Sequence, residues 1–225
     1  MKALNLFPLT VATDVINIDN QERASLIKEI ENMQLQTNTE STYAWTGDTK
    51  GHEFLFGNRL FKNLGKKISN SIIKYLQLLE INTNLLDIYF QRSWATYTKT
   101  EQSINFHTHS QSNISFAYYL LKPKDSGGII FRSNELQNEI AKNIFTSSKL
   151  EKSLINKPNA YNSDKSVFDL DQDSIIIFPS KTPHATLPNK SGQVRISISG
   201  DISIMLKDSS GFEHLMPNFN NWTKF

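Results

Sequence analysis

The sequence contains no cysteine, and this absence excludes disulfide bonds, zinc–thiolate sites and thiol nucleophiles. No stretch approaches the roughly 18 uninterrupted apolar residues that span a membrane. The first residues also lack the long apolar region and cleavage site of a signal peptide. The net charge is only +2, and the basic residues are scattered along the chain. We therefore expect a cytoplasmic protein with neither a nucleic acid nor a membrane as partner.

The composition is that of an ordinary globular protein, with 38% hydrophobic and 20% charged residues among 225. A chain of this length can bury a core without covalent or metal cross-links. It shows no internal repeat and no long low-complexity linker. We therefore expect a single domain over residues 1–225.

Two helices are predicted in the first third of the chain. Asp19 and Glu22 have the spacing of a capping box, with aspartate in place of serine or threonine, and apolar residues follow at helical spacing. A second apolar stripe predicts a helix from about Asn58 to Glu80. We interpret residues 1–84 as an N-terminal strand and helical support for the rest of the chain.

Short strands replace helices in the remainder. Their predicted ranges are 85–97, 102–108, 113–121, 128–132, 166–170, 174–178 and 193–205. This order favours a mainly β sandwich or barrel over 85–205, with flanking helices packed outside. Residues 134–163 are polar and irregular and are expected to be an insertion, with a short helix near 135–145, while 206–225 form a tail.

Three of the five histidines occur in a context that suggests chemistry. Asn105, His107 and His109 alternate, so in a strand they would project to one face and line a cavity. His184 follows an apolar strand and a proline-rich turn. A lone His-x-His is more often ordinary strand surface, and the two other histidines, His52 and His214, are expected in surface or loop positions.

Arg195 lies eleven residues after His184 and begins an alternating strand in which Ser197 shares its face. A buried arginine is costly unless an anion pairs with it. A guanidinium matches a carboxylate in two-point geometry, and the Ser197 hydroxyl could add a hydrogen bond. A strand arginine is more often an internal salt-bridge partner, so the order and spacing of all these residues matter more than any one of them.

The stretch 94–199 resembles the double-stranded β-helix, or jelly roll, of iron(II)/2-oxoglutarate oxygenases. It looks most like an oxygenase family of phage and marine bacterial proteins. The segments that carry this resemblance are Ser93-Trp94-Ala95, His107-Thr108-His109, Ser115-Phe116-Ala117-Tyr118-Tyr119-Leu120 and Phe178-Pro179-Ser180 before His184. Tyr118-Tyr119-Leu120, Gly127-Gly128-Ile129 and Pro183-His184 are also similar to segments of prolyl hydroxylases.

The resemblance implies an iron(II) site with open positions for 2-oxoglutarate and O2. His107 would be the proximal ligand and His184 the distal one. His109 stands where most relatives carry an aspartate or glutamate, so either His109 is the third ligand or water takes that place. Arg195 would hold the far carboxylate of 2-oxoglutarate. Ser197, Tyr119 and Asn105 are the further cofactor-binding candidates.

The implied reaction couples decarboxylation of 2-oxoglutarate to succinate with oxidation of a C–H bond, most simply a hydroxylation. Three neutral imidazoles would leave the metal site one positive charge higher than two imidazoles and a carboxylate. A cupin-like three-histidine dioxygenase that does not use 2-oxoglutarate is therefore an alternative, and so is a non-catalytic binding module. The substrate is expected to be a small molecule or a peptidyl group, with residues 41–57 and 134–163 as candidate lids. A homodimer is left open.

Overall fold

The computed structural model describes residues 1–2, 4–37, 41–133, 135–213 and 215–225. Its α-helices are α1 (Asn20–Thr37), α2 (Lys62–Leu78) and α3 (Ser147–Glu151). Its strands are β1 (Ala12–Val15), β2 (Trp45–Thr46), β3 (Leu86–Thr98), β4 (Ile114–Leu121), β5 (Ile129–Arg132), β6 (Lys165–Phe168), β7 (Ser174–Pro179), β8 (His184–Thr186) and β9 (Arg195–Leu206). Single turns of 3-10 helix lie at Gly47–Lys50 (η1), Leu55–Gly57, Arg59–Phe61, Thr83–Leu85 and Phe219–Asn221.

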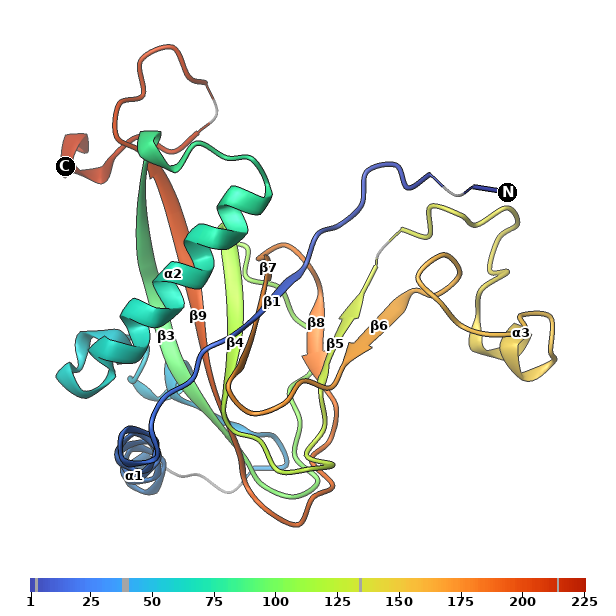
Figure 1. The fold of residues 1–225 in the computed structure, drawn as a ribbon, viewed down its shortest axis with the longest axis horizontal. Helices are drawn as coiled ribbons and strands as arrows, with labels where there is room; N and C mark the ends of the chain where they lie inside the picture. The colour runs from blue at the N-terminus through green and yellow to red at the C-terminus, as the bar shows by residue number, and fades with distance from the viewer. Residues whose placement is uncertain (3, 38–40, 134, 214) are drawn as a thin grey trace.

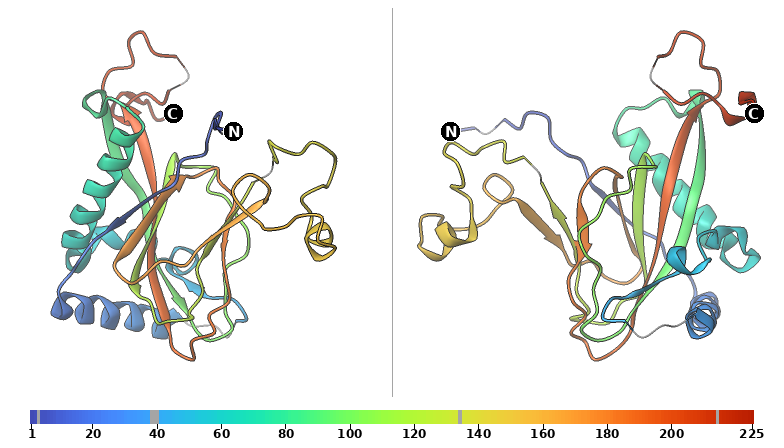
Figure 2. Two further views of the ribbon diagram at one scale, coloured as in Figure 1. Left: turned by 45° about the vertical axis from the view of Figure 1, so that its right-hand side comes forward. Right: turned by 180° about the vertical axis from the view of Figure 1, so that it is seen from behind.

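Two antiparallel sheets make up the body of the fold (Figure 1). The larger has the strand order β1-β7-β4-β9-β3-β2 and the smaller has the order β6-β5-β8. Figure 2 shows α2 on the side of the large sheet that is turned away from the small sheet. The prediction of a mainly β fold with flanking helices is therefore confirmed. No helix among the described residues is long and apolar enough to cross a lipid bilayer.

The main hydrophobic core lies between the helices and the large sheet. Glu22 donates its backbone N–H to Asp19 Oδ1 at 2.7 Å, which confirms the predicted start of α1. The apolar stripes of both helices are buried against alternate residues of the central strands. The buried set includes Leu26, Ile30, Leu64, Ile68, Ile72, Leu76, Phe116, Tyr118, Leu120, Ile196 and Ile198.

The opposite face of the large sheet is polar, because side chains alternate along each strand. Ile196 and Ile198 of β9 belong to the core, whereas Ser197 and Ser199 line a cavity. The register pairs Ser199 with Ala117 and with Trp94, which line the same cavity. The large sheet therefore presents one face to its helices and the other to a pocket beneath the small sheet.

A register shift divides β3 into two parts. Phe90 pairs with Ile202 and Arg92 pairs with Asp201, so Gln91 is an extra residue in this strand. Phe90 packs against the helix-side core, although Trp94, an even number of residues later, lines the cavity. The bulge therefore shifts the alternation of side chains, so that even-numbered residues after it, such as Trp94, face the cavity and not the helix-side core.

Two of the predicted elements are wrong. Residues 102–108 do not form a strand, because Thr186 Oγ1 accepts the Ile104 N–H at 2.9 Å, and regular ladder pairing is reduced to a single bridge between His107 and His184. The helix predicted near 135–145 is absent, and α3 forms only afterwards, at Ser147–Glu151. No residue of α3 is buried, so this polar insertion offers no apolar stripe to pack a longer helix.

The backbone of Phe168 packs directly against Gly128, so a methyl group added at Gly128 would overlap the Phe168 carbonyl. We expect Gly128→Ala to destabilise the protein by about 1–3 kcal/mol, as overpacking of a close contact does. The measurement is urea denaturation. Gly57→Ala is the control, because a Cβ there meets nothing within 4 Å. Equal denaturation midpoints for the two variants would contradict the prediction.

Candidate metal and co-substrate site

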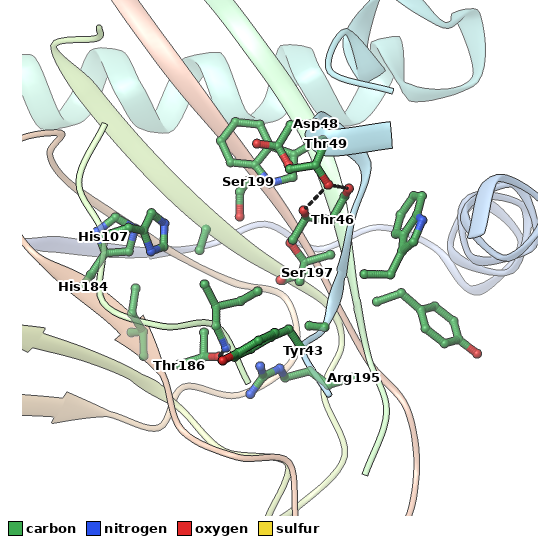
Figure 3. A pocket seen from close by; sticks show the side chains of 18 of the residues that line it. Tyr43, Thr46, Asp48, Thr49, His107, His184, Thr186, Arg195, Ser197 and Ser199 are labelled. Atoms are coloured by element: carbon green, nitrogen blue, oxygen red, sulfur yellow. Dashed lines mark hydrogen bonds between the residues drawn. The ribbon is translucent and has the colours of Figure 1, made fainter. Parts of the chain in front are cut away.

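The cavity between the two sheets has a volume of about 830 Å³. Its polar walls include His107, His109, His184, Thr186, Arg195, Ser197, Ser199, Tyr119, Asn105, Tyr43, Thr46, Asp48 and Thr49. In Figure 3, His107 and His184 lie at one side, Arg195 lies at another, and Ser197 and Ser199 lie between them. The fold thus brings together every residue that the sequence singled out for metal or co-substrate binding.

His107, His109 and His184 form one cluster, in which one ring nitrogen of each lies within 4.8 Å of those of the others. His184 is the first residue of β8, and its backbone exchanges two 3.0 Å hydrogen bonds with that of His107. His109 lies two residues after His107 and donates its backbone N–H to Ser180 O at 3.0 Å. The chain therefore fixes all three imidazoles through backbone pairing beside the cavity.

The Nδ1 atoms of the three rings face hydrogen-bond acceptors. His107 Nδ1 lies 2.8 Å from Asn105 O, and His184 Nδ1 lies 3.0 Å from Thr182 O. His109 Nδ1 lies 3.2 Å from a carboxylate oxygen of Asp201. Carbonyl and carboxylate oxygens only accept, so each Nδ1 must carry the proton, and each neutral ring keeps its lone pair on Nε2. Metal-binding histidines are commonly oriented in this way.

Burial keeps two of these rings neutral. It lowers the pKa of His184 to about 3, with a further contribution from neighbouring His107, and it also lowers the pKa of His107. Neutral imidazole is a good ligand for divalent first-row metals, iron(II) among them. The donor set therefore fits a transition-metal ion.

Asp201 is a site residue that the sequence analysis missed. Its side chain is fully buried on β9, with Oδ1 near His109 and 3.0 Å from the Ser115 hydroxyl. Its Oδ2 accepts from Arg92 Nη2 at 2.7 Å and from Gln111 Nε2 at 2.9 Å. Burial alone would raise the pKa of Asp201, but hydrogen bonding to His109 and the Arg92 charge bring it to about 2. Its position, two residues beyond Ser199 on the same strand face, was visible in the sequence.

Arg195 is the largest fully buried side chain, with 1% of its surface exposed. Its Nη1 donates to the carbonyls of Ser126 and Gly127 at 2.6 and 3.1 Å, and its Nη2 lies 3.5 Å from Thr98 Oγ1. Within the described ranges, no carboxylate lies within 4.0 Å of it. Burial accordingly lowers the pKa of Arg195. Arg195 lines the cavity, so its charge is placed where it could pair with an anion that enters the cavity.

Three further candidates lie on the same cavity. Ser197 lines it beside Arg195, and Tyr119 pairs with Ser197 across β4 and β9. Burial raises the pKa of Tyr119 to about 12, so this side chain is a neutral phenol that can donate a hydrogen bond. Asn105 also lines the cavity, and its carbonyl orients His107.

The expected lid segments divide into one that reaches the cavity and one that does not. Residues of the segment 41–57 line it, among them Tyr43 and Trp45, whereas no described residue of the insertion 134–163 does. His52 stands apart from the histidine cluster, 6.2 Å from the ring of Trp45. His214 lies outside the described residues.

Residues 92–201 match the family model described as "Putative 2OG-Fe(II) oxygenase". No curated protein matches the chain in sequence. Solved structures do resemble it. HygX from Streptomyces hygroscopicus, with nickel and 2-oxoglutarate bound, shares 8% identity at a TM-score of 0.55, covering 87% of this chain and 83% of HygX. A Pseudomonas putida prolyl-4-hydroxylase shares 13% identity at a TM-score of 0.52, covering 87% and 92%.

The viral collagen prolyl hydroxylase of Paramecium Bursaria Chlorella virus-1 shares 14% identity at a TM-score of 0.50, covering 85% of this chain and 94% of that one. At these identities the likeness concerns the fold, and it confirms the double-stranded β-helix. The segment that matches the family model contains the three clustered histidines and Arg195. By that match, residues 92–201 are similar to those of the 2-oxoglutarate- and iron(II)-dependent oxygenases.

Proposed function

We propose that the protein is a 2-oxoglutarate-dependent hydroxylase whose iron(II) is held by His107, His109 and His184. The observation that carries this proposal is a single cavity with three clustered imidazoles at one side and, at another, a buried guanidinium that has no carboxylate partner among the described residues. When bound, the metal would supply activation of O2 and oxidation of a C–H bond, coupled to conversion of 2-oxoglutarate to succinate.

His109 enters this proposal as a ligand and not as a neighbour of the metal. Its ring centroid lies 4.9 Å from that of His107 and 5.2 Å from that of His184, and its Nδ1 is occupied by Asp201. The remaining Nε2 completes a three-nitrogen set, which leaves other coordination positions open for co-substrate and O2.

Arg195 is assigned to the far carboxylate of 2-oxoglutarate. A buried cation without a protein carboxylate is costly, and a dianionic co-substrate offsets this cost when it binds. Ser197 and the neutral phenol of Tyr119 would add hydrogen bonds to the same carboxylate. Asn105 would stay at the metal end of the cavity, where its carbonyl already holds His107.

The proposed activity predicts succinate formation when the iron-loaded protein is incubated with 2-oxoglutarate and oxygen. The readout is succinate separated by chromatography. A cupin-like three-histidine dioxygenase would bind the metal and form no succinate. A non-catalytic module would do neither, so each alternative has its own outcome.

Hydroxylation is the simplest outcome of this chemistry, and the substrate is expected to be a small molecule or a peptidyl side chain. The wall formed by Tyr43, Thr46 and Thr49 would face it, since these residues border the cavity opposite the histidines. Candidate substrates can be screened by mass spectrometry for the gain of one oxygen atom. Products that lose hydrogen without gaining oxygen would replace hydroxylation with desaturation or cyclisation.

A further inference from the structure

The metal site as proposed lacks the negative charge that a carboxylate ligand would bring. Three neutral imidazoles contribute no charge, so an iron(II) ion among them keeps its full positive charge. The cavity lining offers a carboxylate at Asp48, but the described histidine cluster contains no acidic residue. The nearest fully buried carboxylate is that of Asp201, which lies behind His109.

We propose that Asp201 takes over the role of the missing carboxylate ligand by acting on the metal through His109. This inference rests on the proposed function, because it assumes that His109 binds the metal. Asp201 is then a positioning residue: its Oδ1 lies 3.2 Å from His109 Nδ1 and directs the opposite nitrogen into the cavity. A carboxylate hydrogen-bonded to imidazole also raises the basicity of the ring and hence its strength as a ligand.

Each Asp201 oxygen is held by separate partners. Oδ1 accepts from Ser115 as well as facing His109, and Oδ2 accepts from Arg92 and Gln111. The carboxylate therefore cannot rotate without breaking several hydrogen bonds at once. A partner needed only to neutralise Arg92 would not require an oxygen aimed at the imidazole.

The local charges also favour this role. Arg92 lies between two carboxylates, 2.7 Å from Asp201 Oδ2 and 3.6 Å from Asp48 Oδ2. Two carboxylates and one guanidinium leave one net negative charge beside the metal site. That is the same charge that one carboxylate ligand would supply, placed one residue further from the metal.

The test uses cobalt(II) as a probe, titrated calorimetrically into the full chain after metal removal. We expect Asp201→Asn to lower cobalt(II) affinity by about 10- to 100-fold, the range seen when outer-shell partners of metal ligands are removed. Asp173→Asn is the matched control, because Asp173 also pairs with an arginine, Arg23, at 2.8 Å and with the Tyr118 hydroxyl at 2.7 Å. It should lose stability but keep cobalt(II) affinity. Equal losses of affinity in both variants would reduce Asp201 to a stability residue.

A second background separates a positioning role from a structural one. In His109→Asp the metal regains a carboxylate ligand, and Asp201 has no imidazole to orient. There Asp201→Asn should lower cobalt(II) affinity much less than in the wild type, because only the nearby negative charge is lost and no imidazole is left to orient. An equal fold-loss in the two backgrounds overturns the proposal. If the single Asp201→Asn variant does not fold, the comparison of His109→Asp with the double variant still decides, since a loss of about 10- to 100-fold in the double variant contradicts it.

Failure of the proposed function looks different. If the wild-type chain binds no cobalt(II), the proposed metal site itself is contradicted. Tight binding by the wild type with no change in Asp201→Asn would remove only the role given to Asp201. The visible spectrum of bound cobalt(II) adds a readout independent of turnover, and we expect its bands to shift in Asp201→Asn and not in Asp173→Asn.

Discussion

Replacing His107 with alanine is expected to lower metal affinity by more than about a hundredfold and to abolish succinate formation. The variant removes one of three ligand nitrogens, a larger loss than the roughly 10- to 100-fold typical of outer-shell partners. His107 is the least buried of the three histidines, so the loss of packing is small. The measurements are cobalt(II) titration and succinate release from the iron-loaded protein.

His52→Ala is the matched control, because it removes an imidazole that lies outside the cluster. Both variants should unfold at similar temperatures in the presence of a chelator, so that a difference in metal affinity is not a difference in folding. Wild-type metal affinity in His107→Ala would exclude this histidine as a ligand, whatever the activity of the variant.

The second large effect is expected from Arg195→Gln on 2-oxoglutarate binding. Charge-assisted hydrogen bonds contribute about 1.5–3 kcal/mol each. A guanidinium edge that makes two of them would account for about 3–6 kcal/mol, or about two to four orders of magnitude in affinity. Arg195→Lys keeps the charge without the two-point geometry and should fall between wild type and glutamine. The measurement is calorimetric titration of 2-oxoglutarate into metal-loaded protein.

Arg195 also has a structural role, because it donates to the carbonyls of Ser126 and Gly127. Its loss leaves buried acceptors unpaired and should cost about 1–3 kcal/mol of stability. Metal affinity without 2-oxoglutarate is therefore the internal control and should remain close to wild type. Unchanged 2-oxoglutarate affinity in Arg195→Gln would assign the carboxylate to another residue.

Much of the fold could be predicted because its elements follow local patterns. The stripe from Phe61 to Leu76 and the alternation in β9 each bury one face, and both were visible along the chain. β8 was missed because its three residues are too few to show a period. The segment 102–108 was misassigned because alternation is compatible with a strand, while its hydrogen bonding depends on Thr186, far away in the sequence.

The part of the site that could be predicted consists of residues whose type alone suggests metal or anion binding. His107, His184 and Arg195 were found from residue type, order and strand face, and the cavity brings them together. Asp201 was not found, although it continues the polar alternation of β9. Its meaning depends on His109 and Arg92, which reach it only through the pairing of distant strands. Which ring nitrogen faces the cavity depends likewise on acceptors that only the folded chain provides.

Because Gln91 is an extra residue in β3, the side chains that point to a given face of the sheet are even-numbered on one side of it and odd-numbered on the other. Before it, even-numbered residues such as Ile88 and Phe90 pack against the helix-side core. After it, even-numbered residues such as Trp94 and Thr96 line the cavity. Deleting Gln91 would rotate one half of the strand by one residue. Either the polar side chains after it would be placed against the helices, or the apolar side chains before it would point toward the pocket.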